Sequence, residues 1–204
     1  MYNVNKNVYF NPSYSLPIGP TQIIARNIFN STNFHLVDTT GITDSVGYFW
    51  YDSNFYDARP GYFDTMVVKK YDFSTLSSKL KVAKSLMIRL NVINGFPADI
   101  FVQLYFDNEG NQVIDSLFNS GALKIASAAV NTLSVVTNPF ILNNYDTYLD
   151  RSEIDHLILA RDLRLFIRIE TKNEGIPYIK FYPDYKIDLD LALRIELEMN
   201  LGDI

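Results

Sequence analysis

Aromatic side chains crowd into one stretch, residues 46–63, beside carboxylates and an arginine. Aromatic rings offer a flat apolar surface that suits the face of a sugar ring, and neighbouring charged groups bind hydroxyl groups. Side chains of a strand alternate between faces, so we expect Tyr48 and Trp50 on one face and Phe49 and Tyr51 on the other. We take six residues as the candidate ligand-binding site: Tyr48, Trp50, Tyr51, Asp52, Tyr56 and Arg59.

A purely structural interpretation of this stretch stays open. Aromatic residues favour strands and pack well there, so the same rings would also suit a core. A contiguous exposed patch would favour the binding site, and burial of the rings would favour the core.

Carboxylates form a second candidate, with Asp184, Asp188 and Asp190 standing beside Lys186. Such a group would suit a hard cation or acid–base chemistry. We favour the alternative, in which the polar face of the last strand holds Asp188, Asp190, Glu196 and Glu198, and Arg89 or Arg168 on a neighbouring strand pairs with them. Residues 107–111 lack the spacing of a calcium loop and indicate a hairpin turn. We therefore predict no metal site and no cofactor.

Catalytic signatures are missing from the sequence. The two histidines, His35 and His156, stand without a GxSxG motif, and the match of Ser78 and Lys81 to SxxK lacks its partner motifs. No phosphate-binding loop, dinucleotide fingerprint or HExxH occurs, and the chain has no cysteine for a thiolate nucleophile or a disulfide. We predict that the protein is not an enzyme and rank a carbohydrate-active enzyme last.

Composition sets further limits. The chain of 204 residues is 48% hydrophobic and 20% charged, which is typical of a folded globular protein. A net charge of −5 argues against a nucleic-acid partner. No apolar run approaches the length of about 18 residues that a membrane helix needs. The N-terminus shows no signal-peptide core, so we expect either a cytosolic protein or one whose export signal has been removed.

The stretch that organises the fold is residues 186–201, KIDLDLALRIELEMNL, where apolar side chains fall on every second position. This alternation predicts a long strand of an antiparallel sheet with one wet face. Its length predicts that it bends or serves two sheets. We expect it to close the protein's own sheet, and the alternative is pairing with an edge on another molecule.

Earlier segments predict further elements. Apolar alternation at 86–92 and 100–106, joined by Asn94-Gly95-Phe96-Pro97, predicts an antiparallel hairpin. Helices are expected after Thr21, after Asp72 or Ser74, and after Asp150, which forms a capping box with Glu153. A helix, strand, turn and strand then recur about Asn173, which indicates an internal duplication of a helix–strand–strand unit; shared turn chemistry is the alternative.

Several of these segments also resemble a known family. The runs INGFPADIFVQLYFDNEGNQVIDSLF and KIASAAV, with NPSYSLPIG before them and RIETKNEGIPYIKFYPDYKIDLDLALRI after them, are similar to cell-envelope lipoproteins of the Bacteroidetes. The resemblance covers most of the chain and implies an exported, lipid-anchored, β-rich protein. It brings no activity and no catalytic residues. The chain departs from the family because it lacks the signal peptide and the lipidated cysteine.

Together these observations predict a mainly β, antiparallel sandwich-like fold with two or three short helices. We expect a single β-rich domain over residues 1–204, with an aromatic-rich part at 1–71 and a duplicated part at 72–204. The expected function is a non-enzymatic envelope or surface protein that binds a glycan polymer or a protein partner. The alternative is a structural component of an envelope assembly joined through strand edges.

Overall fold

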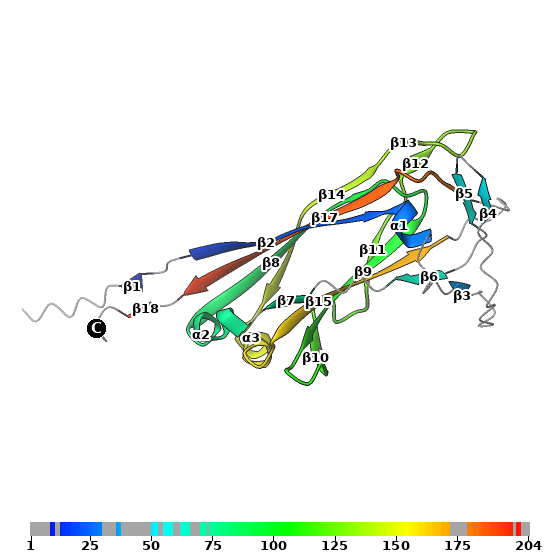
Figure 1. Cartoon of the computed structure of the whole chain (residues 1–204). Helices are drawn as coiled ribbons and strands as arrows, with labels where there is room; N and C mark the ends of the chain where they lie inside the picture. The colour runs from blue at the N-terminus through cyan, green and yellow to red at the C-terminus, as the bar shows by residue number, and fades with distance from the viewer. Residues whose placement is uncertain are drawn as a thin grey trace, which may run out of the picture.

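The chain folds into two antiparallel sheets that lie face to face, as the computed structural model shows in Figure 1. The structure describes residues 9–10, 13–29, 36–37, 50–52, 55–58, 62–65, 70–72, 74–171, 179–197 and 199–200.

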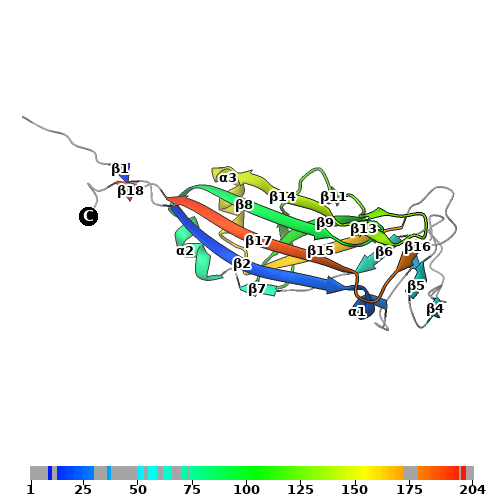
Figure 2. The ribbon, with the colours of Figure 1, turned by 90° about the horizontal axis from the view of Figure 1, so that it is seen from above.

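The first sheet holds its strands in the order β14 (Phe140–Leu149), β8 (Ala83–Asn94), β17 (Lys186–Leu197) and β2 (Ser13–Ile24). The central strand β17 lies between β8 and β2 and pairs with both along nearly its whole length (Figure 2). The apolar positions of β17 are buried, and its alternate positions carry the charged side chains. The predicted long amphipathic strand is thus confirmed, and it closes the protein's own sheet.

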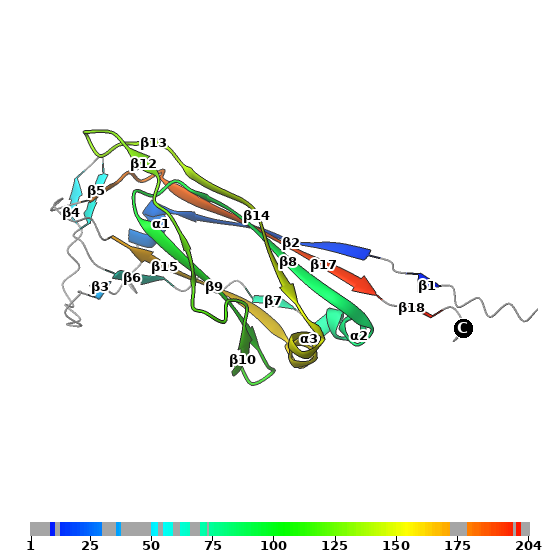
Figure 3. The ribbon, with the colours of Figure 1, turned by 180° about the vertical axis from the view of Figure 1, so that it is seen from behind.

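The second sheet has β9 (Asp99–Asp107) and β15 (Asp162–Glu170) at its centre (Figure 3). The remaining strands pair around them: β10 (Val113–Ser116) and β11 (Leu123–Ile125) with β9, β6 (Tyr62–Thr65) and β7 (Lys70–Asp72) with β15, and β3 (Leu36–Val37) with β6. The turn at 107–111 joins β9 to β10 as an antiparallel hairpin, as predicted.

The core fills the space between the two sheets. Each long strand contributes alternate apolar side chains, among them Leu90 from β8, Leu104 from β9, Leu165 from β15 and Leu193 from β17, each at most 4% exposed. Burial of apolar surface on this scale is the main stabilising contribution to a sandwich. The predicted fold class, a mainly β antiparallel sandwich-like fold with short helices, is confirmed.

The predicted hairpin of 86–92 with 100–106 is wrong, because β8 and β9 belong to different sheets. The turn between them carries the chain across the core, so the apolar faces of the two strands oppose each other instead of lying side by side. Asn94, fully buried, holds this corner: its Nδ2 donates to the oxygens of Ala98 (3.0 Å) and Ala126 (2.8 Å), and its Oδ1 accepts from the N–H of Phe96 (2.9 Å). These bonds replace the ladder that a hairpin would have made.

The helix predicted after Thr21 begins later. Residues up to Ile24 continue β2, because Ile24 is still opposite Lys186 in the ladder with β17. The helix α1 (Ala25–Phe29) follows, and its first N–H donates to the oxygen of Tyr185 at 2.8 Å. Pairing with β17 therefore overrides the capping signal of Thr21.

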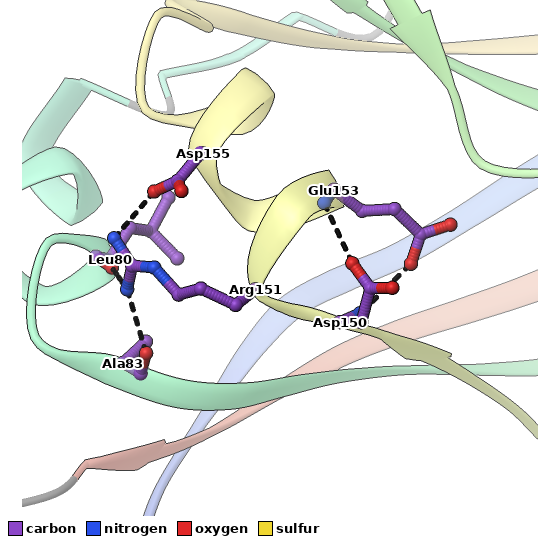
Figure 4. A network of polar contacts seen from close by, with 6 residues as sticks. All are labelled: Leu80, Ala83, Asp150, Arg151, Glu153 and Asp155. Carbon is purple, nitrogen blue, oxygen red and sulfur yellow. Dashed lines mark hydrogen bonds and ion pairs between the residues drawn. The ribbon is translucent and has the colours of Figure 1, made fainter.

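The other two predicted helices are present. The short helices η1 (Ser74–Leu76) and α2 (Ser77–Leu80) follow Asp72, whose Oδ1 accepts from the N–H of Ser74 at 2.9 Å. The helix α3 (Arg151–Leu157) begins with the predicted capping box of Asp150 and Glu153 (Figure 4). The helix α2 leads into β8 of the first sheet, whereas α3 leads into β15 of the second.

Smaller sheets complete the two ends. At one end β1 (Tyr9–Phe10) pairs with β18 (Met199–Asn200), so the stretch 186–201 does serve two sheets, as predicted. At the other end lie β12 (Ala129–Val130) with β13 (Val136–Asn138), and β16 (Ile179–Phe181) with β5 (Phe55–Ala58) and β4 (Trp50–Asp52). Figure 1 shows β2 and β17 running together toward the end that holds β1 and β18.

Candidate functional site

The outer face of the first sheet carries a row of polar side chains. Residues opposite each other in an antiparallel ladder lie on the same face of the sheet. Asn91 of β8 is opposite Asp190 of β17, and Asp190 is opposite Pro20 of β2. One row further on, Ile93 is opposite Asp188. Their strand neighbours, such as Leu90 and Leu189, are buried, so these side chains point away from the core.

The strand β14 extends the same row with a bulge. Its ladder with β8 shifts between Leu142 and Tyr145, which leaves Asn143 and Asn144 without opposite residues. Asn144 has a φ of 55°, a left-handed conformation that asparagine tolerates better than most residues. Its N–H donates to Oδ1 of Asn91 at 2.7 Å. The bulge is thereby fixed to the centre of the sheet.

Together these residues line a depression that we call the transverse hollow. It has a volume of about 530 Å³ and takes residues from β2, β8, β14 and β17: Pro20, Asn91, Ile93, Asn143, Asn144, Asp188, Leu189 and Asp190. Its volume lies within the range of roughly 300–1,000 Å³ that is typical of small-ligand sites. The hollow crosses the strands, so a ligand in it would contact several of them at once.

The two carboxylates of the hollow differ in their partners. Asp188 accepts from Nε2 of Gln22 at 2.7 Å and forms an ion pair with Nζ of Lys186 at 3.0 Å. Burial alone would raise the pKa of Asp188, but these two partners outweigh it and hold the pKa below its ordinary value. Asp190 is exposed, and its carboxylate has no hydrogen bond or ion pair within the part of the chain that the structure describes. Asp190 is therefore the carboxylate available to a ligand.

The predicted partners of these carboxylates are wrong. Arg89 lies on the outer face of β8 but binds Asp146 of β14 through two hydrogen bonds of 2.7 Å each. Arg168 lies on β15 in the other sheet, out of reach of β17. The expectation of a polar strand face holds for Asp188, whose cation is Lys186 two residues before it on its own strand.

The chemistry of the hollow suits hydrogen bonding to neutral groups. Asparagine amides supply both donors and acceptors, Asp190 supplies acceptors, and Pro20 and Ile93 supply apolar surface. Among the described residues no group of three or more histidine and acidic side chains could hold a metal ion. Within those same residues, no helix is long and apolar enough to cross a membrane.

The sequence-predicted aromatic site lies in a different place. Trp50, Tyr51 and Asp52 form β4, and Tyr56 lies on β5 opposite Tyr51. Only the backbone of these four residues is described, whereas Tyr48 and Arg59 lie outside the described residues. The assignment of this site therefore stays a prediction. In the ladder of β4 with β5, Tyr51 is opposite Tyr56 and Trp50 is opposite Asp57.

One ring of the aromatic stretch has described contacts. Phe55 of β5 is partly buried, and its ring centroid lies 5.9 Å from that of Tyr182. Lys180 places Nζ 4.5 Å from the centroid of Phe55. Tyr182 continues the contact to Tyr185, whose hydroxyl accepts from the N–H of Val136 at 2.8 Å. Part of the stretch thus packs within the protein, as the structural interpretation expected.

A second aromatic group, which the sequence reasoning missed, lies on the outer face of the second sheet. Phe101 and Tyr105 of β9 stand opposite Arg168 and Arg164 of β15, and both guanidinium carbons lie over the opposite ring, at 4.4 Å and 5.5 Å from its centroid. The sequence does contain a signal for this group, because these residues alternate with apolar core positions on β9 and β15 and are therefore expected to face outward. Because cations of the same chain cover the ring faces, this face is a packed layer rather than an open platform.

Comparison with family models and with curated proteins gave no match. Among solved structures, a "putative secreted protein" from Parabacteroides distasonis matches with a TM-score of 0.46 and 15% identity, over 65% of this chain and 38% of its own. The VP2 subviral particle of infectious bursal disease virus matches with a TM-score of 0.37 and 8% identity, over 92% of this chain and 32% of its own. This chain therefore spans well under half the length of the structures it matches.

Proposed function

We propose that this protein is a non-enzymatic binding module that holds a neutral glycan in the transverse hollow. The observation that carries the proposal is that one depression brings together three kinds of group. These are asparagine amides from β8 and β14, the carboxylate of Asp190, which no described residue pairs, and the apolar side chains of Pro20 and Ile93. Sugar hydroxyl groups need donors and acceptors side by side, and the C–H face of a sugar ring needs apolar surface.

Charge favours a neutral ligand over an acidic one. The chain carries a net charge of −5, and Lys186, which precedes the hollow on β17, is already paired with Asp188. An acidic polymer would meet Asp190 without a compensating cation among the residues that line the hollow. The hollow is therefore suited to uncharged hydroxyl groups.

Binding is favoured over hydrolysis by the environment of Asp188. Glycoside hydrolysis by two carboxyl groups needs one of them to stay protonated as a general acid, which requires a raised pKa. The pKa of Asp188 is lowered by Gln22 and Lys186, so this residue is suited to the ionised state. Asp188 is therefore not suited to act as the general acid, and this favours binding over hydrolysis in the hollow.

A direct test is isothermal titration with a panel of soluble neutral glucans, mannans and xylans and with peptidoglycan fragments. For a polysaccharide that binds, Asp190→Ala and Asn143→Ala should each weaken binding at least about tenfold, because each removes hydrogen bonds to the ligand. Asp184→Ala is the matched control, since Asp184 is exposed and outside the hollow. Unchanged binding in both hollow variants would overturn the proposal.

We further propose that the protein acts after export, at the cell envelope or surface. This proposal rests on the sequence resemblance to Bacteroidetes envelope lipoproteins. Fractionation of cells that express the full-length gene product tests it, with recovery in the membrane or medium as the expected result and recovery in the cytosol as the contrary one.

A second candidate function, assembly through strand edges, is favoured by the difference between the two outer strands of the first sheet. In the described part of the chain, β2 is outermost on one side and contains Pro17, Pro20 and Gly19 with a φ of 102°, features that hinder further strand pairing. On the other side β14 contains no proline and no lysine, and it exposes Ile141 (53%) and Tyr148 (69%).

Sedimentation velocity separates this candidate from a monomeric binding module. If β14 joins chains, the protein should form oligomers at high concentration, and Ile141→Lys with Tyr148→Lys should return it to the monomer, because charges on an edge strand oppose pairing. Val113→Lys is the control, since Val113 is equally exposed but lies on β10. A wild-type protein that stays monomeric would reject the assembly function and leave glycan binding untouched.

A further inference from the structure

The turn between α2 and β8 lies at the opposite end of the fold from the sheet of β4, β5 and β16 (Figure 2). Residues of this turn line a second depression. It has a volume of about 440 Å³ and is lined by Lys81, Val82, Ala83, Lys84 and Arg151. We call it the cationic depression. The turn is closed by the N–H of Val82, which donates to the oxygen of Lys79 at 3.3 Å, and Lys81, Val82 and Lys84 are all exposed.

Arg151 lines this depression, and Figure 4 shows the hydrogen bonds that hold its guanidinium group in place. Its Nη1 donates to the backbone oxygens of Leu80 (3.1 Å) and Ala83 (2.8 Å), and its Nη2 donates to Oδ1 of Asp155 (2.5 Å). The capping box of Asp150 and Glu153 fixes the start of the helix that carries Arg151. A guanidinium group fixed in this way needs little further ordering to bind a ligand.

Donors remain on Arg151 after these contacts. A guanidinium group has about five N–H donors, and three are used by Leu80, Ala83 and Asp155. One N–H of Nη2 and the N–H of Nε therefore have no acceptor within the described part of the chain. Arginine forks of this kind match the oxygens of phosphate and carboxylate groups.

The charge balance of the depression is positive although the whole chain is negative. Three of its lining residues are cations and none is acidic, whereas the net charge of the chain is −5. Asp155 neutralises Arg151, but Lys81 and Lys84 have no ion pair with any residue that the structure describes. Like charges held close together repel, so an anion with two negative charges would relieve this repulsion.

We propose that the cationic depression is a binding site for a phosphoryl group, contacted by Lys81, Lys84 and Arg151. A phosphoryl group carries up to two negative charges near neutral pH and three acceptor oxygens, which matches two ammonium groups and the remaining donors of Arg151. This site is separate from the transverse hollow and does not depend on glycan binding. The phosphoryl group would belong either to a soluble phosphorylated molecule or to a lipid headgroup, and the exposed apolar Val82 would touch the acyl region only in the second case.

The first test uses inorganic phosphate and a soluble sugar phosphate, glucose 6-phosphate, titrated into the ¹⁵N-labelled full chain. We expect saturable shifts of the backbone amides of residues 81–84 and 151, and Lys81→Gln with Lys84→Gln should weaken binding at least about tenfold. The matched control is Lys124→Gln with Lys180→Gln, which removes the same charge elsewhere. Arg151→Lys keeps the charge but loses the fork, so it should also weaken binding.

The second test distinguishes the source of the phosphoryl group. Vesicles of phosphatidylcholine with phosphatidic acid are floated with the wild-type protein, with the two double variants, and with Val82→Ser. The site is assigned to a lipid headgroup if the wild-type protein floats with the vesicles and two variants float less. These are the double variant Lys81→Gln with Lys84→Gln, and the single variant Val82→Ser. Saturable binding of the soluble phosphates without flotation assigns it to a soluble ligand. If neither the soluble phosphates nor the vesicles bind, or if the lysine variants bind like their control, the proposal is overturned.

Discussion

Arg89 and Asp146 stand directly opposite each other on β8 and β14 and are joined by two parallel hydrogen bonds, Nε to Oδ1 and Nη2 to Oδ2, each 2.7 Å long. This pair links the outermost strand to the interior of the first sheet on its solvent-facing side. Protonation of Asp146 would weaken this pair, so the attachment of β14 to β8 should depend on pH.

The pair predicts a dependence of stability on acid pH. Hydrogen bonding from Arg89 is the main reason why the pKa of Asp146 lies below its ordinary value of 3.8. A lowered folded-state pKa means that the stabilisation is present above pH 3.8 and is lost as the pH falls through the folded-state value. In urea unfolding between about pH 5 and pH 2, Asp146→Asn should lose this part of the pH dependence. An unchanged profile would show that the pair is not formed in solution.

Asn94 predicts a large loss of stability on substitution. Asn94→Ala would leave the oxygens of Ala98 and Ala126 and the N–H of Phe96 without their partner at a fully buried corner. Unsatisfied buried groups cost about 1–3 kcal/mol each, so we expect a loss of at least about 2 kcal/mol in the free energy of unfolding. Urea denaturation measures it, and Asn119→Ala, at an exposed residue, is the control. An equal stability of the two variants would contradict the role of Asn94.

Gly95 predicts a steric requirement beside that corner. A Cβ at this position would meet the backbone oxygen of Lys186 at 2.7 Å, and the N–H of Gly95 donates to the same oxygen at 2.9 Å. Gly95→Ala should therefore push the turn away from β17 and lower the midpoint of thermal unfolding by several degrees. Gly110→Ala, whose new Cβ would approach only the side chain of Asn108, is the comparison and should have the smaller effect.

Trp50 tests the aromatic stretch as a ligand contact. It is the only tryptophan of the chain, so its fluorescence reports on this stretch alone. If the sequence-predicted site binds a glycan, a soluble polysaccharide should change its emission in a saturable way, and Tyr51→Ala and Tyr56→Ala should weaken the effect. Constant emission while Asp190-dependent binding persists would restrict glycan binding to the transverse hollow. Trp50→Phe provides the baseline.

Period-two alternation in the sequence predicts which face of most strands is buried, but it does not predict which strands pair. The apolar and polar faces of β17 and the inward faces of β8, β9 and β15 follow from period-two spacing in the sequence. Which strands pair is decided by contacts distant in the chain. For this reason the spacing about Asn94 predicts a hairpin turn, although this turn joins two different sheets.

The transverse hollow shows the same limit. Asn91, Asp188 and Asp190 were predictable as outward-facing residues, but their union with Asn143 and Asn144 needs the place of β14 beside β8. The sequence up to residue 145 predicts only short strands and loops, not the long strand β14, because the bulge interrupts the alternation at two successive asparagines. Spacing within one strand does not say which strands lie beside it, so it cannot predict a site that several strands form together.

The central position of β17 has a consequence for biosynthesis. Within the described chain β2 and β8 join the same sheet only through β17, the last long strand in the sequence. Residues 186–197 must therefore leave the ribosome before β2, which is made early, can join the same sheet as β8. Until then, the apolar faces of both strands lack their common neighbour, so the first sheet is completed only after residues 186–197 have left the ribosome.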